Sequence, residues 1–485
     1  MITKTLFTAV AAGLAWSAAV AQPDPTGRSV APEDLRMDLG IIRSTLEQAH
    51  PDPYRYPGKA GLDTLFATIH ASLSTPLTSE EFIRAAMPVF RAVGDAATRL
   101  TPPAEVERAY EHSEPLIPFT VAVIEGRLYL DQELKGFRSL PTGCELLRIN
   151  GRGSAEILAL LRSGVVPEGE DTTLLDRTIE QDFPVMYRRF VESAERFKVE
   201  YRAGDGSVRE QQVIGLTKDE MRSSLRRPGI DLQPWRMEDL RDLGTAWLTL
   251  STMDRQELGR SRIVPERFLG QVQEALERGE VRTLVIDLRG SHGGDPAQAN
   301  QVFALIAQKP FRSVSSMYIR SGEVPDSYRY ATPAPEFFAS VNGMYMPALN
   351  GRRVLQATDP RLRLEPPREK AFQGKVYVVC DGGTRDAAAL LVMLANRTGR
   401  ARTVGEETGS NAAGYCGGNG LAVTLPGTGC VLQVPLTCYV PEGIPAGPVE
   451  RGELPVYRVP RQAADLALGR DTVREALLNL IAELQ

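Results

Sequence analysis

The sequence has 485 residues, with 56 Lys and Arg against 61 Asp and Glu, and a formal net charge of −5 at pH 7. Hydrophobic residues make up 42% and charged residues 24%, which excludes a mini-protein, a coiled coil and a disordered chain. The mild excess of acid, without a long basic run, argues against a nucleic-acid partner. Imidazole chemistry could draw on four residues only: His50, His70, His112 and His292.

Residues 1–21 predict a secretory signal peptide. Lys4 gives a positive start, the stretch from Leu6 to Val20 is apolar, and Ala19-Val20-Ala21 is a small-x-small cleavage site. The stretch is short for a bilayer span, and no later apolar run has transmembrane length. We expect an exported protein, periplasmic or extracellular, with no membrane span after signal removal. The alternative is a buried N-terminal helix.

Residues 22–110 predict an N-terminal helical domain. Apolar residues recur at helical spacing over 35–46 and again over 62–73. Thr78-Ser79-Glu80-Glu81 is a capping-box start for a third helix that runs to Phe90.

Residues 111–215 predict a β-rich module. Alternating apolar residues over 119–123, a turn at Glu125-Gly126 and a return over 128–130 predict a hairpin. Residues 143–163 read as a strand, an Asn150-Gly151 turn and a helix, an order that resembles the second half of a PDZ-type module. The helical stretch 167–195 would be an insertion in it, and the alternative is another small β-rich domain.

Residues 240–485 alternate strand and helix, which predicts a mostly parallel sheet with covering helices. The expected fold class is therefore α/β within an α+β multidomain chain, with ligands at the carboxyl ends of the strands. Residues 316–370 show little periodicity and predict a long surface excursion. The predicted strands cover 246–250, 284–288, 376–380 and 403–405, and the predicted helices cover 262–278, 297–307 and 387–396.

Five sequence stretches stand in a characteristic order: AVGDAATRL (92–100), VIDLRGSHGGD (285–295), VYVVCDGGTRDAAALL (376–391), VGEETGSNAAGYCGGN (404–419) and LAVTLPGTGCVLQVPL (421–436). This order resembles the tail-specific, or C-terminal-processing, serine peptidase family, in its tricorn-core-like branch. The resemblance covers most of the chain after the signal. It implies a ClpP/crotonase-like α/β protease domain over residues 240–485 and a serine-type peptidase fold.

The catalytic positions of that family are substituted in this sequence. The family's nucleophilic serine stands in a T-x-S-A setting, which matches residues 384–387 and places Asp386 at the serine position. The base histidine of a G-D-G-H-T-like segment matches Ala97, and the lysine base of the other branch matches Asn411. A methyl group cannot accept a proton and an amide is not basic, so the resemblance implies a protein without either catalytic solution.

The resemblance also places an oxyanion cradle at the backbone N–H groups of Gly293, Gly294 and Ala387. A carboxylate at Asp386 would oppose the negative charge that acyl transfer develops there. The simplest interpretation of Asp386 is a structural N-cap for the helix over 387–396. The alternative is a relic position that binds a cationic or amide group of a ligand.

His292 lies in the glycine-rich turn beside the predicted cradle. It could pair with Asp386 as base and nucleophile of a rewired hydrolase, although an exposed turn histidine is the simpler interpretation. No HExxH or CxxC spacing occurs, so we expect no metal and no cofactor. A hairpin with its loop at Pro426–Thr428 would place Cys416 opposite Cys438, which permits a cross-strand disulfide. The alternative is Cys416 as a thiol nucleophile.

Three functional hypotheses follow. The first is a catalytically inactive, exported homologue that binds peptides or protein C-termini, with the PDZ-like part available for carboxylate capture. The second is an active hydrolase rewired around Asp386 and His292. The third is a small-ligand carrier, as in the retinoid-binding relatives of the family. The sequence leaves the ligand and the oligomeric state open.

Overall fold

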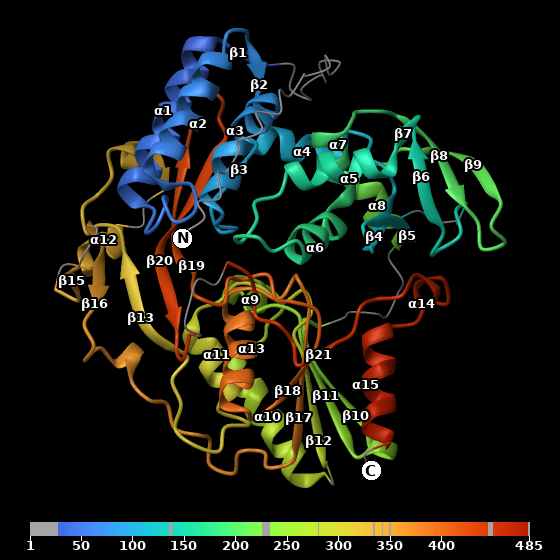
Figure 1. The fold of residues 1–485 in the computed structure, drawn as a ribbon, viewed down its shortest axis with the longest axis vertical. Coiled ribbons are helices and arrows are strands. Elements are labelled where there is room, and N and C mark those ends of the chain that lie inside the picture. The colour runs from blue at the N-terminus through green and yellow to red at the C-terminus, as the bar shows by residue number, and fades with distance from the viewer. Residues whose placement is uncertain are drawn as a thin grey trace, which may run out of the picture.

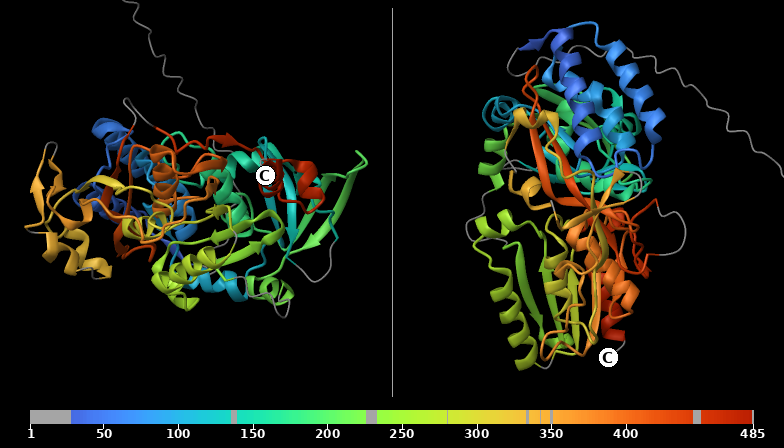
Figure 2. Two further views of the ribbon diagram at one scale, coloured as in Figure 1. Left: turned by 90° about the horizontal axis from the view of Figure 1, so that it is seen from below. Right: turned by 90° about the vertical axis from the view of Figure 1, so that its left-hand side faces the viewer.

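The computed structural model describes residues 28–134, 139–225, 233–279, 281–332, 335–341, 343–348, 351–444 and 450–483. The predicted signal peptide, residues 1–21, lies outside the described residues. A helical block and a β-rich module occupy one half of the molecule, and a sheet with its covering helices occupies the other (Figure 1). The long hairpin of strands β19 and β20 joins the two halves (Figures 1 and 2).

The N-terminal block contains the three helices that the sequence predicts. Thr78 is the N-cap of the third helix: its hydroxyl accepts from the Glu81 N–H, and the Glu81 carboxylate accepts from the Thr78 N–H, so the capping box is confirmed. The elements are β1 (Ser29–Val30), α1 (Pro32–Ala49), α2 (Gly58–Ser72), β2 (Leu77–Thr78), α3 (Ser79–Val93), β3 (Arg99–Thr101) and α4 (Ala104–His112).

The β-rich module has its own hydrophobic core. The predicted hairpin is confirmed, with a turn at Glu125-Gly126, and the strands are ordered β4-β5-β6-β8-β9, with β7 paired to β6. The predicted helical stretch forms two helices that add Ile179, Phe183 and Tyr187 to this core. The elements are β4 (Phe119–Ile124), β5 (Arg127–Glu133), β6 (Glu145–Ile149), β7 (Arg152–Gly153), α5 (Ser154–Ser163), α6 (Thr173–Gln181), α7 (Phe183–Phe190), β8 (Arg196–Arg202), β9 (Val208–Ile214) and α8 (Lys218–Leu225).

A six-stranded sheet in the order β10-β11-β12-β17-β18-β21 carries the candidate site. Its pairs are parallel except β10 with β11, which confirms the predicted mostly parallel sheet. The elements are β10 (Trp235–Leu240), β11 (Thr245–Leu250), α9 (Arg255–Arg260), α10 (Pro265–Arg278), β12 (Thr283–Asp287), α11 (Pro296–Phe303), β17 (Lys375–Cys380), α13 (Asp386–Thr398), β18 (Arg402–Gly405), β21 (Tyr457–Arg458), α14 (Ala463–Ala467) and α15 (Thr472–Glu483).

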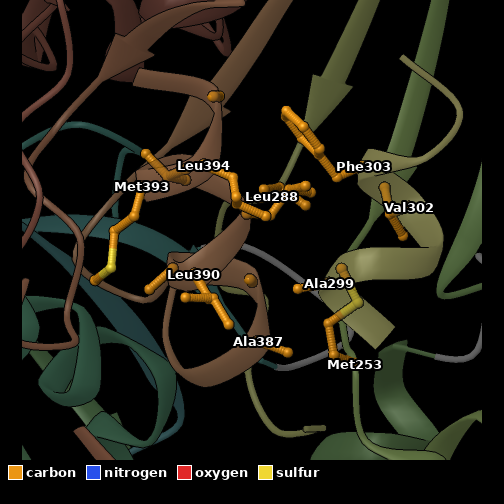
Figure 3. Packing of buried hydrophobic residues seen from close by; sticks show 14 of the residues in the cluster. Met253, Leu288, Ala299, Val302, Phe303, Ala387, Leu390, Met393 and Leu394 are labelled. Carbon is orange, nitrogen blue, oxygen red and sulfur yellow. The ribbon is translucent and has the colours of Figure 1, made fainter. Parts of the chain in front are cut away.

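Helices cover both faces of this sheet. Val285, Tyr377 and Leu477 share a cluster in which α15 closes one face. On the other face α10, α11 and α13 share a larger core, and Figure 3 shows Ala387 of α13 beside Ala299 of α11. Because both side chains are small, the two helices can pack closely at the start of α13. Helix α11 ends at Phe303, earlier than the predicted end at residue 307.

A second, antiparallel sheet corrects the prediction for residues 316–370. This segment is not a surface excursion, because its strands pair with one another and with the β19–β20 hairpin. Its strands are two to six residues long, and β13 and β14 pair with strands about a hundred residues further along the chain, so no local alternation marks them. The sheet has the order β14-β19-β20-β13-β16-β15, with β3 paired to β20. The elements are β13 (Val314–Ile319), β14 (Ala331–Thr332), α12 (Pro335–Val341), β15 (Tyr345–Pro347), β16 (Arg353–Leu355), β19 (Tyr415–Thr424) and β20 (Val431–Pro441).

The N-terminal helices share their core with the β19–β20 hairpin. Leu39 and Phe90 belong to one cluster with Leu432, so the core continues beyond the boundary predicted at residue 110. The buried Asp38 carboxylate accepts hydrogen bonds from the backbone N–H groups of Gly427 (2.9 Å) and Thr428 (2.7 Å) at the hairpin tip. Asp38 thus anchors the tip of the hairpin to α1.

Cys416 and Cys438 form the cross-strand disulfide that the sequence permits. The bond removes Cys416 as a thiol nucleophile. The predicted register, which pairs Cys416 with Cys438, holds from Tyr415 to Gly417. From Gly420 toward the hairpin loop the pairing is shifted by one residue. The bulge is the reason for this difference, since an extra residue on one strand moves all later pairs.

Within the part of the chain that the structure describes, no helix has both the length and the apolar character needed to cross a membrane.

Candidate active site

A cavity of about 770 Å³ opens between the two halves of the molecule and is lined by Ala97, His292 and Asp386. These three residues come from the N-terminal block, the turn after β12 and the start of α13. The structure therefore brings the predicted nucleophile and base positions to one cleft. Gly293 and Gly294 of the predicted cradle line the same cavity, whereas Ala387 is fully buried behind it.

The sheet positions the cleft through two adjacent parallel strands. Because β12 and β17 are neighbours, the turns that follow their carboxyl ends lie side by side. The Thr384 hydroxyl donates to the Leu288 carbonyl (2.8 Å), and the Arg385 N–H donates to the Ser291 carbonyl (2.8 Å). These bonds fix the start of α13 against the glycine-rich turn.

Asp386 is not the N-cap that the sequence suggests. Arg385 occupies the N-cap position, and Asp386 is the first helical residue, with a φ of 54° in the left-handed region. Its N–H donates to the Ser410 hydroxyl (2.8 Å), and its carboxylate Oδ2 accepts from the Gly293 N–H (2.8 Å). The unusual backbone angle is the reason for the difference, because it turns the carboxylate away from its own helix and toward the turn after β12.

The donors of the predicted oxyanion cradle are largely taken up within the protein. The Gly293 N–H donates to the Asp386 carboxylate, and the Ala387 N–H donates to the Gly293 carbonyl (3.3 Å). Two of the three predicted donors are therefore occupied. The Gly294 N–H has no protein acceptor among the residues that the structure describes. An oxyanion hole needs donors aimed at the place where charge develops, so this arrangement offers one amide at most.

Ala97 presents only a methyl group to the cavity, and the nearby buried imidazole of His50 is held elsewhere. His50 Nδ1 accepts from the Asp52 N–H (3.0 Å), so in the neutral ring Nε2 carries the hydrogen and donates to Asp95 Oδ2 (2.8 Å). Both ring nitrogens are thus used in structural bonds. His50 and Asp95 also lie close to Cys416 in a grouping of potential metal ligands, but the Cys416 sulfur belongs to the disulfide.

Asn411, at the position of the alternative lysine base, is buried and does not line the cavity. Its side-chain amide donates to the Tyr56 hydroxyl (2.9 Å), and its carbonyl oxygen accepts from the Ala413 N–H (2.8 Å). Burial raises the pKa of Tyr56 to about 12, so this phenol stays protonated at neutral pH. Neither residue supplies a base to the cleft.

His292 does not pair with Asp386. Its Nδ1 lies 3.2 Å from the Gly290 carbonyl, and its Nε2 lies 3.5 Å from the Glu257 carboxylate on α9. The side chain is 27% exposed, which is less than a free turn histidine would show. The rewired pair that the sequence allows is absent in this geometry, because the ring faces α9.

Sequence reasoning missed Glu168, which also lines the cleft. Its carboxyl is buried and accepts from the Ala96 N–H (2.9 Å). Burial, and after it the negative charge of Asp95, raises the pKa of Glu168 well above its usual value. Glu168 lies in the insertion between α5 and α6, where no motif marks it; only the packing of that insertion brings it to the cleft.

Two arginines of the cleft, Arg99 and Arg385, were also missed as site residues. Arg99 Nε donates to the side-chain oxygen of Gln433 (2.7 Å), which is a neutral partner. The Arg385 guanidinium has no hydrogen bond or ion pair with any residue in the described ranges. Both arginines lie inside motifs quoted from the sequence, but only the catalytic positions beside them were predicted as site residues.

The cleft of this α/β domain lies where the strand-to-helix turn before α13 faces the glycine-rich turn after β12. Residues 245–417 match the family model described as Peptidase family S41. This stretch is therefore similar to S41 peptidases, the tail-specific family that the motifs of the sequence resemble.

Solved structures extend this likeness over the whole fold. The crystal structure of mature CPAF has a TM-score of 0.63 and 14% identity, over 92% of this chain and 96% of that one. Mature CPAF complexed with lactacystin has a TM-score of 0.65 and 13% identity, over 93% and 98% of the two chains. A mutant of CPAF has a TM-score of 0.66 and 14% identity, over 92% and 96%. Because the sequence identity is 13–14%, these matches show a similar fold only. No curated protein matches the chain.

Proposed function

We propose that this chain is an exported S41-fold protein that does not hydrolyse peptides and instead binds peptides or protein C-termini in the cleft around Asp386. The closed cradle carries the proposal: the Gly293 N–H is bonded to the Asp386 carboxylate and the Ala387 N–H to the Gly293 carbonyl. A negative side chain thus takes up a donor that acyl transfer would need for its oxyanion.

The lack of a base supports the same conclusion. The Ala97 methyl cannot accept a proton, and His50 uses both nitrogens in bonds to Asp52 and Asp95. Loss of one member of a catalytic triad costs about four to six orders of magnitude in turnover, and further losses add little. The cleft of about 770 Å³ nevertheless remains open to a ligand.

Hydrolysis assays on the purified protein test this proposal. Denatured proteins and peptides with free C-termini should be cleaved no faster than the buffer background. The double variant Asp386→Ser with Ala97→His should gain weak hydrolysis, because it restores nucleophile and base and frees the Gly293 N–H. Each single variant is the matched control and should stay at background. Robust turnover by the unmodified protein would overturn the proposal.

The hydrolase rewired around Asp386 and His292 receives no support from these contacts, since His292 lies against Glu257. If hydrolysis is observed, its persistence in both Asp386→Ala and His292→Ala would exclude that alternative as well. Export is tested separately: N-terminal sequencing of protein recovered outside the cytoplasm should give Gln22 as the first residue, whereas Met1 would contradict cleavage after Ala21.

A further inference from the structure

Strand β9 is an open edge of the sheet in the β-rich module, and Figure 1 shows it at the outer side of the molecule. With seven residues it is the longest edge strand among the described residues. It contains no proline, and its pairing with β8 runs without a bulge. Prolines and bulges commonly protect exposed edges, so β9 remains able to pair with another strand.

The opposite edge of the same sheet is covered. Strand β4 forms that edge, and helices α6 and α7 pack against it. The Val123 N–H of β4 donates to the Glu180 carboxylate, and the Val123 carbonyl accepts from the Arg177 guanidinium (3.5 Å). Side chains of α6 thus take up free backbone groups of β4. No other segment in the described ranges does this for β9.

Alternate residues of β9 turn their backbone groups away from β8. At the two ends of the hairpin, the Gly215 N–H donates to the Glu195 carbonyl (2.8 Å) and the Ala203 N–H donates to the Ser207 carbonyl (2.9 Å). Because antiparallel strands alternate between hydrogen-bonded and non-hydrogen-bonded pairs, the odd-numbered residues of β9 bond to β8. The even-numbered residues therefore offer their N–H and C=O groups to the open edge; they are Val208, Glu210, Gln212 and Ile214.

The strand is self-complementary about a two-fold axis through Gln211. Antiparallel pairing about this axis puts Val208 opposite Ile214 of a second copy. The same axis puts Glu210 opposite Gln212 of the second copy. The residues that meet are those whose backbone groups are available, so each pair can exchange two hydrogen bonds. Val208 and Ile214 are 54% and 64% exposed in one copy, and opposite residues of paired strands point to the same face, so each covers the other.

Other registers of the same pairing fit less well. A shift by two residues in one direction sets Glu210 opposite Glu210 of the second copy, and like charges directly opposite destabilise a sheet. A shift by two in the other direction sets Glu210 opposite Ile214 and leaves Val208 without a partner on β9. A shift by one residue sets available backbone groups opposite groups that already bond to β8. The axis through Gln211 is therefore favoured.

Little has to change on β9 for this pairing. Glu210 forms an ion pair with Lys198 of β8 (2.8 Å). Arg209 pairs with an acid of the hairpin loop, so the charges of the edge are balanced within one copy. The Gln211 side-chain amide donates to the Gln212 carbonyl (3.0 Å). An N–H of the second strand replaces this exposed bond, which releases the two Gln211 amides to bond to each other across the axis.

We propose that the chain forms a two-fold symmetric dimer in which the β9 strands of two copies pair antiparallel about Gln211, so that the sheets of the two β-rich modules become one. The cleft around Asp386 takes no part in this pairing. The dimer therefore carries two such clefts and forms whether or not a peptide is the ligand. One pair of strands buries less area than a standard interface, so the dimer should dissociate at low micromolar concentration.

Cysteine cross-linking tests the position of the axis. In Gln211→Cys the two introduced thiols belong to a non-hydrogen-bonded pair with Cα atoms about 4.5 Å apart, within reach of a disulfide. Mild oxidation at about 100 µM protein should give a covalent dimer that a reductant reverses. Glu210→Cys is the matched control and should stay uncoupled, because its two copies are displaced by two residues. The native free cysteines are buried and do not interfere. A cross-link at Glu210 and none at Gln211 would overturn the proposal.

Sedimentation velocity tests the register. The unmodified protein at about 100 µM should sediment as a dimer. Val208→Lys and Ile214→Glu should each weaken dimerisation by at least about tenfold, because each sets a charge against an apolar side chain. The double variant should recover the dimer, since each lysine then faces a glutamate of the other copy; within one copy the two lie about 20 Å apart along the strand. Val264→Lys is the matched control, an exposed valine outside β9, and should leave the dimer unchanged.

Two further results would overturn the β9 dimer. A monomer at all concentrations up to about 100 µM would leave the edge to a strand of a different protein. A dimer that neither Val208→Lys nor Ile214→Glu weakens would be joined elsewhere. Unchanged melting temperatures of the variants show that a lost dimer is not a loss of fold. The hydrolysis assays on the cleft are independent of all these measurements, so the proposed function stands or fails separately.

Discussion

Two clusters of charged residues lie at the carboxyl ends of the same parallel strands, and they differ in how completely their charges are paired. At one cavity, of about 370 Å³, Arg289 donates to both carboxylate oxygens of Asp287 and to Asp471. In the cleft around Asp386, Arg99 and Arg385 have no acid partner in the described residues. Arg289 is paired with acids without a ligand, whereas Arg99 and Arg385 are not, which separates a structural charge from charges available for binding.

The paired cluster continues into the module above the sheet. Arg177 of α6 forms ion pairs with Glu180 and with Glu406, which follows β18, and Arg461 also pairs with Glu180. Burial raises the pKa of Glu180 to about 8, against the opposing effect of the Arg177 charge. These contacts join the β-rich module to the sheet domain. Arg289 of the D-L-R-G motif joins the end of β12 to Asp471 at the start of α15.

The largest expected effect is on stability, in the paired cluster. Arg289→Ala should lower the free energy of unfolding by about 3–5 kcal/mol, because it leaves the buried Asp287 carboxylate without its counter-charge. Denaturant titration followed by fluorescence measures the change. Arg289→Lys should recover part of the loss. A drop below about 1 kcal/mol would mean that the cluster is no more structural than an ordinary surface pair.

The second prediction concerns pH and the buried residue Asp171, which precedes α6. Burial raises the pKa of Asp171 from 3.8 to about 7, and one of its carboxylate oxygens has no partner among the described residues. The folded state therefore binds more protons than the unfolded state between these values. The stability that the protonated carboxyl contributes is fully present below about pH 4 and is lost as the pH rises to about 7.

Asp171→Asn removes this dependence while keeping an acceptor for the Thr173 N–H. The unfolding free energy of the unmodified protein, minus that of the variant, should fall by about 2–4 kcal/mol between pH 4 and 8. Measuring both proteins at each pH cancels the titration of all other groups. A constant difference would show that Asp171 is ionised throughout and belongs with the fully paired charges.

The sequence predicted the turns that carry Arg289 and Arg385. It did not predict which side chains meet at these turns. The D-L-R-G and T-R-D-A motifs, on strands that the apolar runs mark clearly, placed Asp386 and the glycine-rich turn together. They could not give the left-handed backbone of Asp386, because the hydrogen bond from the Gly293 N–H that holds its carboxylate comes from the turn after β12, far away in the sequence. Glu168 escaped notice because an insertion without a motif carries it into the cleft.

Dependence on residues far along the chain also explains the errors in the predicted fold. The hairpin over 119–133 and the capping box at Thr78 depend on neighbouring residues, and both were predicted correctly. Strand β13 depends on β20 and strand β14 on β19, about a hundred residues further along the chain, and the segment that contains them was taken for a surface excursion. The Cys416–Cys438 pairing was anticipated, but the bulge beside it could not be read from the spacing.

The third prediction concerns the charge of Glu168 in the cleft around Asp386. Since the pKa of Glu168 is raised well above its usual value, its carboxyl is neutral at mildly acidic pH and adds a negative charge to the cleft as the pH rises. Affinity for a free-acid peptide should therefore fall as the pH rises, by up to about tenfold, and Glu168→Gln should flatten this fall. The C-terminal amide is the control and should bind independently of pH; a similar fall for the amide would point to a change in the fold instead.

The smallest expected effect is on stability, at Arg385. Removing this guanidinium breaks no ion pair in the described part of the chain and relieves its repulsion with Arg99. Arg385→Ala should therefore change the free energy of unfolding by no more than about 0.5 kcal/mol, in contrast to Arg289→Ala on the neighbouring turn. Added free-acid peptide should raise the melting temperature of the unmodified protein but not of the variant. A large loss of stability without ligand would mean that Arg385 is a structural charge, and the contrast between the two clusters would fail at the residue on which it depends most.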